Sequence, residues 1–255
     1  MKVIASYSIK GGVGKTTAAV NLAYLSAAQG RRTLVWDLDP QGAATYLFRV
    51  IPRVKGGSSR LVRGKRPLEL AVKNTSYPWL DLLPADFSYR AMDLDLAGAQ
   101  PRAKRAGRTL STLLEELAED YDVAFLDTPP GASLVSENVL HAADLVLVPL
   151  IPTVLAMRTY DQLLDFLATL DRARPTVHTF FSMVDRRKRL HREIVDDATR
   201  TAGRVGSVAV PSLSAIEQMS VHRAPLPSYA PLSAATQAYR ALWSELTARM
   251  GLQSP

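Results

Sequence analysis

Residues 10–17 read K-G-G-V-G-K-T-T and follow directly on the apolar stretch at residues 3–9. An apolar run, a glycine cluster and a longer helix-compatible segment, in that order, predict a buried strand, a tight turn and a helix beginning at Lys15. The backbone N–H groups of such a turn and the N-terminus of the helix form a cradle for phosphate oxygens. The common loop, G-x-x-x-x-G-K-[ST], has glycine where this chain has Ile9, and a second lysine, Lys10, precedes the glycines here.

This loop predicts a nucleotide site with a role for each residue. We expect Lys15 to reach the β- and γ-phosphates and the Thr16 hydroxyl to hold Mg²⁺. The predicted nucleotide-binding residues of the loop are Gly11, Gly12, Val13, Gly14, Lys15, Thr16 and Thr17. The alternative is a glycine turn that joins a strand to a helix and binds nothing. Eight consecutive residues that fit one phosphate-binding geometry favour the nucleotide site.

The remaining chain alternates between short apolar runs and longer segments with helical spacing. Strands are expected at residues 3–9, 32–36, 80–83, 123–126, 145–149, 176–183 and 208–211, and helices at 15–29, 88–99, 106–120, 133–142, 154–173, 190–202 and 236–250. This alternation predicts an α/β fold, a single-domain P-loop NTPase over residues 1–255 with a mostly parallel sheet and helices on both faces. Residues 49–66 contain Pro52 and several glycines and serines, which predicts an exposed, mobile basic loop within the domain.

The loop at residues 10–17 resembles the deviant Walker A box of the ParA/MinD ATPases, in which Lys10 matches the family's signature lysine. D-L-D-P-Q-G at residues 37–42, D-T-P-P-G at 127–131 and V-P-L-I-P-T at 148–153 follow in the family's order. Weaker similarity covers nearly the whole chain, and D-x-D-P-Q-G is typical of the ParA (Soj-like) branch. The resemblance implies ATP and Mg²⁺ as cofactors and a weak, Mg-dependent ATPase activity.

Three aspartates are the candidate carboxylates of this site. Asp127 ends an apolar strand, as a Walker B carboxylate does when it supports Mg²⁺, often through a water. Asp37 and Asp39 flank Leu38, so on an extended backbone they point the same way, although Asp, Pro and Gly are also ordinary turn residues. By resemblance, Asp39 holds the attacking water and Asp37 lies nearer the metal. The predicted metal-supporting residues are Thr16, Asp37 and Asp127.

Lys10 carries the expected mechanism, with Lys15 and Asp39 as the other catalytic candidates. In the family, the signature lysine crosses to the phosphates of a second subunit, so that two protomers enclose two ATP molecules. Phosphoryl transfer needs positive charge on oxygens that gain charge, so a lysine supplied by a partner makes turnover depend on dimerisation. The resemblance therefore implies an ATP-dependent homodimer in which slow hydrolysis acts as a timer.

The resemblance also places the adenine at the ends of the last two strands, near Met183 and Pro211. Relatives carry P-R-x-x-R-x-S-E-A in this region, whereas residues 211–219 here read P-S-L-S-A-I-E-Q-M. Relatives also have an arginine in the turn before the final helix, which is replaced here by Leu232, Ser233 and Ala234. Both differences concern nucleotide or DNA contacts rather than the fold.

The composition excludes several classes of protein. The chain has 255 residues, 47% of them hydrophobic and 22% charged, as in an ordinary globular domain. It has no cysteine, which excludes disulfides, thiolate metal sites and iron–sulfur clusters. No apolar run approaches the ~20 residues that span a bilayer, and the N-terminus enters a strand without a signal-peptide pattern. We therefore expect a cytoplasmic protein.

The net charge of +7 is concentrated in patches that are candidates for nucleic-acid binding. Residues 49–68 alone hold seven basic and no acidic residues, namely Arg49, Arg53, Lys55, Arg60, Arg63, Lys65 and Arg66. The other patches are residues 102–108 and 186–192, with Arg200, Arg204 and Arg223 further along. Each patch alone is equally compatible with a solvated face. Together on an ATP-driven dimer they favour sequence-neutral phosphate contacts, and the predicted DNA-binding residues are Arg186, Arg187, Lys188 and Arg189.

The expected function is an ATPase that dimerises with ATP, binds nucleoid DNA non-specifically and positions or partitions a cargo. The cargo is a chromosome origin, a plasmid or a protein assembly, and a ParB-like or other cargo adaptor stimulates hydrolysis. The first rival is a MinD-like, membrane-associated positioning ATPase. The tail has Leu242, Trp243 and Leu246 at helical spacing but few basic residues, which favours core packing over membrane contact. The second rival, a non-catalytic nucleotide-binding scaffold, disagrees with the intact set of lysines and aspartates.

Overall fold

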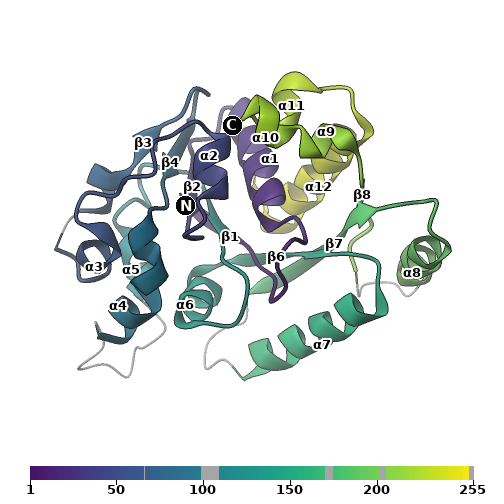
Figure 1. Ribbon diagram of the computed structural model, residues 1–255, viewed down its shortest axis with the longest axis horizontal. Coiled ribbons are helices and arrows are strands. Elements are labelled where there is room, and N and C mark those ends of the chain that lie inside the picture. Colours follow the sequence, from purple (N-terminus) through teal and green to yellow (C-terminus); the bar gives the residue numbers. More distant parts are fainter. Residues whose placement is uncertain (66, 99–108, 170–174, 201–204, 253–255) are drawn as a thin grey trace.

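The computed structural model describes residues 1–65, 67–98, 109–169, 175–200 and 205–252. Within this part of the chain, eight strands form one sheet in the order β3-β4-β2-β5-β1-β6-β7-β8 (Figure 1). Neighbouring strands are parallel, except that β3 and β4 are antiparallel. The strands are β1 (Lys2–Ser6), β2 (Thr33–Asp37), β3 (Lys73–Asn74), β4 (Leu80–Leu83), β5 (Val123–Asp127), β6 (Leu145–Leu150), β7 (Thr176–Val184) and β8 (Ala209–Pro211).

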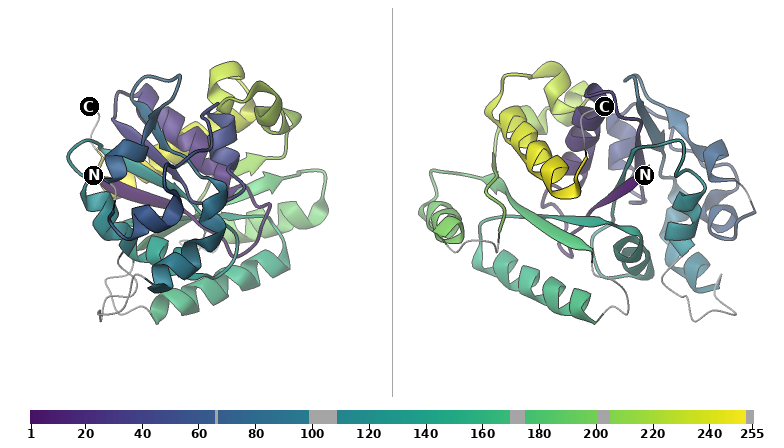
Figure 2. Two further views of the ribbon diagram at one scale, coloured as in Figure 1. Left: turned by 60° about the vertical axis from the view of Figure 1, so that its left-hand side comes forward. Right: turned by 180° about the vertical axis from the view of Figure 1, so that it is seen from behind.

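Helices cover both faces of this sheet, as the sequence predicts (Figures 1 and 2). The larger helices are α1 (Lys15–Ala28), α4 (Met92–Gly98), α5 (Thr109–Glu115), α6 (Leu134–Ala142), α7 (Val154–Ala168), α8 (Arg189–Arg200) and α12 (Ala234–Met250). The shorter ones are α2 (Ala43–Leu47), α3 (Gly57–Val62), α9 (Ser214–Glu217), α10 (Met219–His222), α11 (Leu226–Tyr229), and the 3₁₀ turns η1 (Leu68–Ala71) and η2 (Phe87–Ala91). The α1 and α12 helices share one face, and α6 and α7 lie on the other (Figure 2).

The central strands are buried along their whole length. Every residue of β2, β5 and β6 is buried, because helices cover both faces of these parallel strands. Burial on both faces is also why such strands appear in the sequence as continuous apolar runs. The core on the α1 side includes Phe125 of β5 and Trp243 of α12, whose ring centroids lie 5.9 Å apart. This packing confirms the predicted α/β fold with helices on both faces of the sheet.

The strand order creates a switch point next to β1. The chain passes from β1 through α1 to β2, which lies beyond β5, whereas β6 lies on the opposite side of β1. In open α/β sheets, ligands bind in the crevice at the carboxyl ends of the strands beside such a switch point. The carboxyl ends of β1, β2 and β5 therefore form the edge at which a site is expected.

The basic segment at residues 49–65 differs from the exposed loop that its composition suggests. It contains α3, whose Leu61 and Val62 are buried together with the preceding Val54. The Ser58 hydroxyl donates to Ser88 O at 3.0 Å and to the Asp95 carboxylate at 2.6 Å. Apolar residues spaced within the glycine-rich stretch therefore anchor it, which a count of glycines and serines does not reveal.

The C-terminal helix α12 packs as the sequence predicts. Leu242, Trp243 and Leu246 are buried, and the Trp243 Nε1–H donates to Gln29 Oε1 at 2.9 Å. None of the described helices is both long enough and apolar enough to cross a membrane. The antiparallel edge strand β3, by contrast, was not expected from the sequence, because two polar residues carry no strand periodicity.

Candidate functional site

The loop between β1 and α1 is shaped by two glycines with left-handed backbone conformations. Gly12 has φ +68° and Gly14 has φ +97°, a region that residues with a side chain seldom adopt. A Cβ atom on Gly14 would lie 2.8 Å from the Ser182 hydroxyl of β7, whereas one on Gly12 would meet open space. The close approach of β7 therefore requires glycine at position 14 for space as well as for conformation.

The loop lysine lies inside this turn. Lys15 is buried, its Nζ donates to Lys10 O at 3.0 Å, and its own carbonyl accepts the Ser6 hydroxyl at 2.9 Å. Burial lowers the pKa of Lys15, while the charges of Asp127 and Asp39 act in the opposite direction. Val13 is buried, and Thr16 and Thr17 are half-buried. The predicted loop residues lie at the carboxyl end of β1, because the loop joins this strand to α1.

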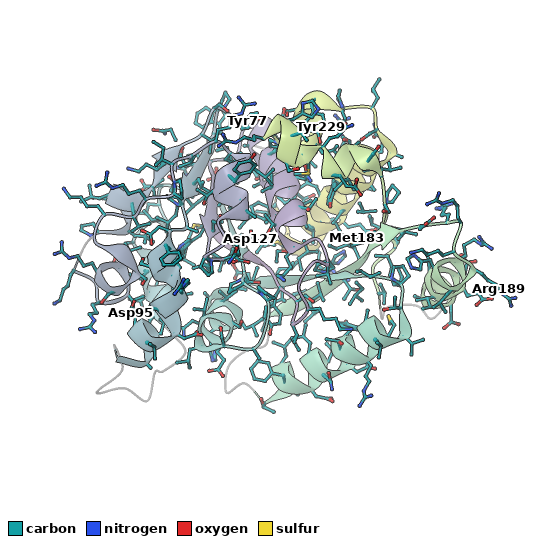
Figure 3. The ribbon with its side chains drawn as sticks, in the orientation of Figure 1. Tyr77, Asp95, Asp127, Met183, Arg189 and Tyr229 are labelled. Carbon is teal, nitrogen blue, oxygen red and sulfur yellow. The ribbon has the colours of Figure 1, made fainter. Side chains whose placement is uncertain are left out.

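Asp127 lies at the centre of this end of the sheet (Figure 3). It is in register with Ser6 of β1 on one side and with Asp37 of β2 on the other. Asp127 is fully buried, and neither of its carboxylate oxygens has a hydrogen-bond partner among the described residues. Burial first, and then the charge of Asp37, raise the pKa of Asp127 well above its ordinary value, while the Thr16 side chain and Lys15 act to lower it.

Asp37 is equally buried but is held by its neighbours. Its Oδ2 accepts from both the backbone N–H and the hydroxyl of Thr45, at 2.7 Å each. Burial raises the pKa of Asp37 to about 6, although the two bonds from Thr45 oppose that shift. Asp39, two residues on, is half-buried and accepts from the Gln41 N–H at 2.9 Å. The structure therefore places two buried carboxylates and a more accessible one beside the loop lysine.

This arrangement fits a divalent cation. A buried carboxylate without a hydrogen-bond donor is costly unless a positive charge or a bound water satisfies it, and Asp127 has two such oxygens. Among the described residues, no cluster of three or more His, Asp or Glu side chains could hold a metal alone. Mg²⁺ suits such a site, because it keeps several waters and binds through one or two protein groups plus substrate phosphates. The residues that could hold it are Thr16, Asp37 and Asp127.

The other predicted site residues lie around this centre. Lys10 is exposed at the outer side of the loop. Met183 and Pro211 lie near each other, because Val184 of β7 is in register with Pro211 of β8. Met183 has φ +54°, unusual for a residue with a side chain, and it is about one-third exposed. The structure therefore brings the two predicted adenine contacts to one rim.

The predicted DNA-binding residues lie apart from this centre, at the start of α8 (Figure 3). Arg187 pairs with Asp185 at 2.9 Å, and Arg189 pairs with Glu193 at 2.6 Å. Arg187 lowers the pKa of Asp185 to about 2. Arg186 and Lys188 are exposed and have no ion pair among the described residues. All four cations face solvent, but two of them are already compensated by carboxylates.

The other basic patches have different environments. Arg49 donates to His222 O at 2.7 Å and to Arg223 O at 3.2 Å, while Arg223 donates to Tyr46 O at 3.1 Å and lies over the Tyr46 ring. These two arginines therefore join α2 to α10 rather than extend freely into solvent. The patch at residues 102–108 and Arg204 lie outside the described residues, as does the side chain of Arg200.

Three site residues were missed by sequence reasoning. Thr45 holds Asp37, Ser182 lies against Gly14, and the buried Asn21 links α1 to the first residue of α11 by accepting from the Leu226 N–H at 2.7 Å. Of these three, Asn21 could best have been predicted from the sequence, because a polar residue on the apolar face of a helix needs a hydrogen-bond partner. Thr45 and Ser182 carry no local signal, since their roles depend on contacts across the fold.

Comparison with known proteins gives consistent matches over the whole chain. Residues 1–179 match the family model AAA_31, described as an AAA domain. The chain is 32% identical over 255 residues to the chromosome-partitioning ATPase Soj of Thermus thermophilus, covering 97% of this chain and 96% of the relative. It is 30% identical over 260 residues to the chromosome partitioning protein ParA of Caulobacter vibrioides, with 98% and 95% covered.

Solved structures agree on the fold. Cobyrinic acid a,c-diamide synthase of Mycobacterium smegmatis, solved with ADP and magnesium, is 27% identical with a TM-score of 0.80 and covers 100% of this chain and 98% of that one. A variant of McdA from Cyanothece, solved as its ATP complex, is 18% identical with a TM-score of 0.82, covering 100% and 98%. The second match concerns the fold alone.

Proposed function

Because the chain belongs to the ParA/MinD family of P-loop ATPases, in its Soj-like branch, we propose that it is an ATP-dependent dimerising ATPase that binds DNA non-specifically and positions or partitions a cargo. The observation that carries the proposal is the pair of fully buried, neighbouring aspartates, Asp37 and Asp127, with the loop lysine Lys15 close enough to Asp127 and Asp39 for their charges to act on it. Such a costly arrangement is retained where a cation and phosphates satisfy it. ATP and Mg²⁺ are the matching cofactors, and the Mycobacterium relative was solved with ADP and magnesium.

The residues of the loop divide the work of phosphoryl transfer. Backbone N–H groups from residues 11–17 bind the phosphate oxygens, and Lys15 reaches the β- and γ-phosphates. Asp39, the more accessible of the three aspartates, orients the attacking water and accepts its proton. Mg²⁺, when bound, neutralises charge that develops on the phosphate oxygens. Thr16, Asp37 and Asp127 would hold this ion, and its charge would satisfy the buried oxygens of Asp127.

Lys10 links this chemistry to dimerisation. Lys10 is exposed, whereas Lys15 is buried within the loop, and this difference supports separate roles for the two lysines. In the proposed dimer, each Lys10 adds positive charge to the phosphates bound by the partner subunit. ATP binding then favours the dimer, and hydrolysis, stimulated by a ParB-like or other cargo adaptor, releases it.

The DNA-binding surface in this proposal is the start of α8. Arg186, Arg187, Lys188 and Arg189 are all exposed there, on a single turn and the helix that follows. Contacts from such side chains to phosphates carry no sequence information, which suits a protein that coats nucleoid DNA. A dimer presents the surface twice, so ATP binding multiplies the affinity for DNA.

The MinD-like alternative needs an apolar helix face for the membrane surface. The apolar residues Leu242, Trp243 and Leu246 of α12 are instead buried in the core. The exposed basic residues of this helix include Arg240 and Arg249, too few for a strongly basic membrane-binding face. These observations support DNA over the membrane as the surface that the dimer binds.

Two variants test the nucleotide site. Lys15→Ala should abolish ATP binding, because the loop loses its cis charge on the β- and γ-phosphates. Asp39→Ala should bind ATP normally and stop hydrolysis, because only the placement of the water is lost. Binding is measured by calorimetry with Mg²⁺ and ATP, and turnover by phosphate release. Unchanged nucleotide affinity of Lys15→Ala, or normal turnover of Asp39→Ala, would remove the corresponding role.

DNA binding is tested by its dependence on salt. ATP-loaded protein should bind unrelated duplexes about equally, and log affinity should fall by about 0.9 per phosphate contact for each tenfold rise in salt. Changing residues 186–189 to alanine should make that slope shallower for every duplex. Binding of the full chain to anionic vesicles provides the membrane arm. Binding to vesicles but not to DNA in the ATP state would favour the MinD-like alternative.

A further inference from the structure

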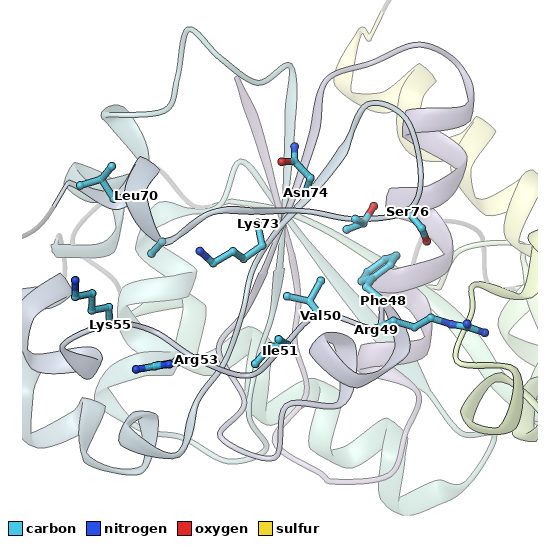
Figure 4. Close-up of a pocket in the computed structure, with 12 residues that line it drawn as sticks. Phe48, Arg49, Val50, Ile51, Arg53, Lys55, Leu70, Lys73, Asn74 and Ser76 are labelled. Carbon is cyan, nitrogen blue, oxygen red and sulfur yellow. The ribbon is translucent and has the colours of Figure 1, made fainter.

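A cavity of about 650 Å³ lies away from the phosphate loop, between two segments that come together at the edge of the sheet (Figure 4). One wall is the chain that follows α2, at residues 48–55, and the other runs from η1 through β3, at residues 70–76. Its volume is within the range of about 300–1,000 Å³ that is typical of ligand pockets. Nothing in the proposed ATPase cycle uses this cavity.

The charge of the lining is of one sign. The cavity is lined by the cations Arg49, Arg53, Lys55 and Lys73 and by no acidic residue. Arg49 is directed toward α10 by its bonds to backbone carbonyls, and it forms no ion pair within the described part of the chain. Lys73 extends across the space between the two walls, and Arg53 and Lys55 lie at one end of it (Figure 4). Such a surface attracts an anionic partner.

The floor of the same cavity is apolar. Phe48 and Ala71 are buried beneath it, and Val50 is half-buried. Ile51 is 76% exposed and Leu70 is 54% exposed, one from each wall. A polar phosphate backbone gains nothing from such side chains, whereas an apolar residue packed against Ile51 would be partly removed from water.

The third feature of the cavity is an open strand edge. β3 is the end strand of the described sheet and pairs only with β4, with Lys73 opposite Leu82 and Asn74 opposite Asp81. The outer edge of an end strand offers backbone N–H and C=O groups to an extended peptide. Asn74, Thr75 and Ser76 add uncharged polar groups to the same wall. A lipid head group or a duplex would not use this edge.

We propose that this cavity docks an acidic, extended segment of a partner protein, with one apolar side chain of that segment packed against Val50 and Ile51 (Figure 4). Its carboxylates pair with Arg53 and Lys73, and its backbone runs along β3. The lining includes no residue of the phosphate loop and none of the three aspartates, so docking can be tested on nucleotide-free protein. The proposal therefore stands or falls separately from the proposed ATPase function.

The test is a selection of random twelve-residue peptides, displayed on phage, on nucleotide-free protein. Each selected peptide is synthesised with a fluorescent label and measured against the wild type and the charge-reversed pair Arg53→Glu with Lys73→Glu. Arg158→Glu with Arg240→Glu, two exposed cations on α7 and α12, is the control with the same change of net charge. Thermal melting of every variant checks that the fold is intact.

We expect peptides rich in Asp and Glu around one apolar residue, which bind at least tenfold more weakly to Arg53→Glu with Lys73→Glu and equally to the control pair. Ile51→Ser should weaken them several-fold, and hydrogen exchange should show protection of residues 70–76. If no selected peptide depends on the charge-reversed pair, or if those that do lack acidic residues, the proposal is overturned. Loss of duplex or anionic-vesicle binding by that pair, without an effect on peptides, would likewise overturn it in favour of nucleic acid or lipid.

Discussion

The carboxyl ends of β1, β2 and β5 and the start of α8 both carry dense charge, but they hold it in opposite ways. At the strand ends, Asp37 and Asp127 are fully buried, and both oxygens of Asp127 lack a hydrogen-bond donor within the described chain. At α8 the cations are exposed, and Arg187 and Arg189 are paired with carboxylates of their own turn and helix. The buried carboxylate Asp127 at the strand ends therefore lacks hydrogen-bond donors, whereas the cations at α8 are already stabilised by water and by neighbouring carboxylates.

The difference separates a site that must be filled from a surface that can be used. A buried carboxylate raises the free energy of the folded state until a cation satisfies it, so its retention points to a ligand. An exposed ion pair contributes about 0–1 kcal/mol and is compatible with solvent alone. The chemistry of the first region is therefore specified by the protein, whereas that of the second depends on what binds.

The largest expected effect comes from the backbone of the buried region. Gly14→Ala should destabilise the protein by about 2–4 kcal/mol, because alanine at φ +97° is strained and its Cβ would lie 2.8 Å from the Ser182 hydroxyl. Nucleotide binding should be lost with it, since Gly14 is the N-cap of α1 and lies within the phosphate loop. Urea unfolding and calorimetry with ATP and Mg²⁺ measure the two effects.

Gly12→Ala is the matched control for this prediction. It has φ +68° but open space around the added atom, so only the conformational strain of about 1–2 kcal/mol remains. Adding Ser182→Ala to Gly14→Ala should recover part of the lost stability, because it removes the nearest atom. Equal losses for Gly12→Ala and Gly14→Ala would show that the approach of β7 does not matter.

The next effect is a dependence of stability on pH that originates in the buried carboxylates. Burial raises the pKa of Asp37 from 3.8 to about 6, so between these values the folded protein binds more protons than the unfolded chain. Stability therefore falls as the pH rises through this window. We expect nucleotide-free protein to lose about 2 kcal/mol between pH 4 and pH 7 relative to Asp37→Asn, as measured by urea unfolding.

Mg²⁺ and ATP should weaken this dependence of stability on pH. A cation beside the carboxylates favours their charged forms, so the loss of stability between pH 4 and pH 7 should shrink when both are present. Asp127→Asn should bind Mg²⁺ and ATP more weakly and show a flatter pH dependence than the wild type. If the free energy of unfolding of the wild type followed pH in parallel with that of both variants, burial would not raise the pKa of these two carboxylates in the folded protein.

The smallest effect is expected for DNA binding by the cations at the start of α8, where two cations with ion pairs can be compared with two that have none. Arg186→Ala with Lys188→Ala should weaken DNA binding about three- to tenfold, because these exposed cations have no ion pair among the described residues. Arg187→Ala with Arg189→Ala should weaken it less, because carboxylates already compensate those arginines. Fluorescence anisotropy with ATP-loaded protein on an unrelated duplex measures both. Equal losses would show that DNA displaces the carboxylates at little cost.

Much of the fold was predictable because its signals are local. Buried parallel strands read as apolar runs, and the phosphate loop requires glycine at fixed positions, so residues 10–17 identify the strand, turn and helix together. The predicted strands at residues 123–126 and 145–149 match β5 and β6 to within one residue. Asp127 could be recognised because it combines a strand end with this motif.

The remainder depends on contacts that no local pattern contains. Residues 57–62 are helical because Leu61 and Val62 reach the core, which the surrounding glycines and basic residues conceal. Thr45 binds Asp37 across eight residues, and Ser182 meets Gly14 from β7, which is two strands away from β1 in the sheet. The ion pairs Arg187–Asp185 and Arg189–Glu193 are different, because they are local in the sequence and the i,i+4 spacing of the second is a pattern that the sequence contains.

The central claim is that ATP joins two copies of this chain through Lys10, and the mass in solution with a slowly hydrolysed ATP analogue tests it most directly. Wild-type protein, measured by size exclusion with light scattering, should shift from the 27.9 kDa of one chain to twice that mass. Lys10→Ala should bind the analogue with unchanged affinity and remain a monomer, because Lys10 is exposed and contributes its charge to the partner. A normal dimer of Lys10→Ala, or a wild type that stays monomeric with bound analogue, would contradict the account.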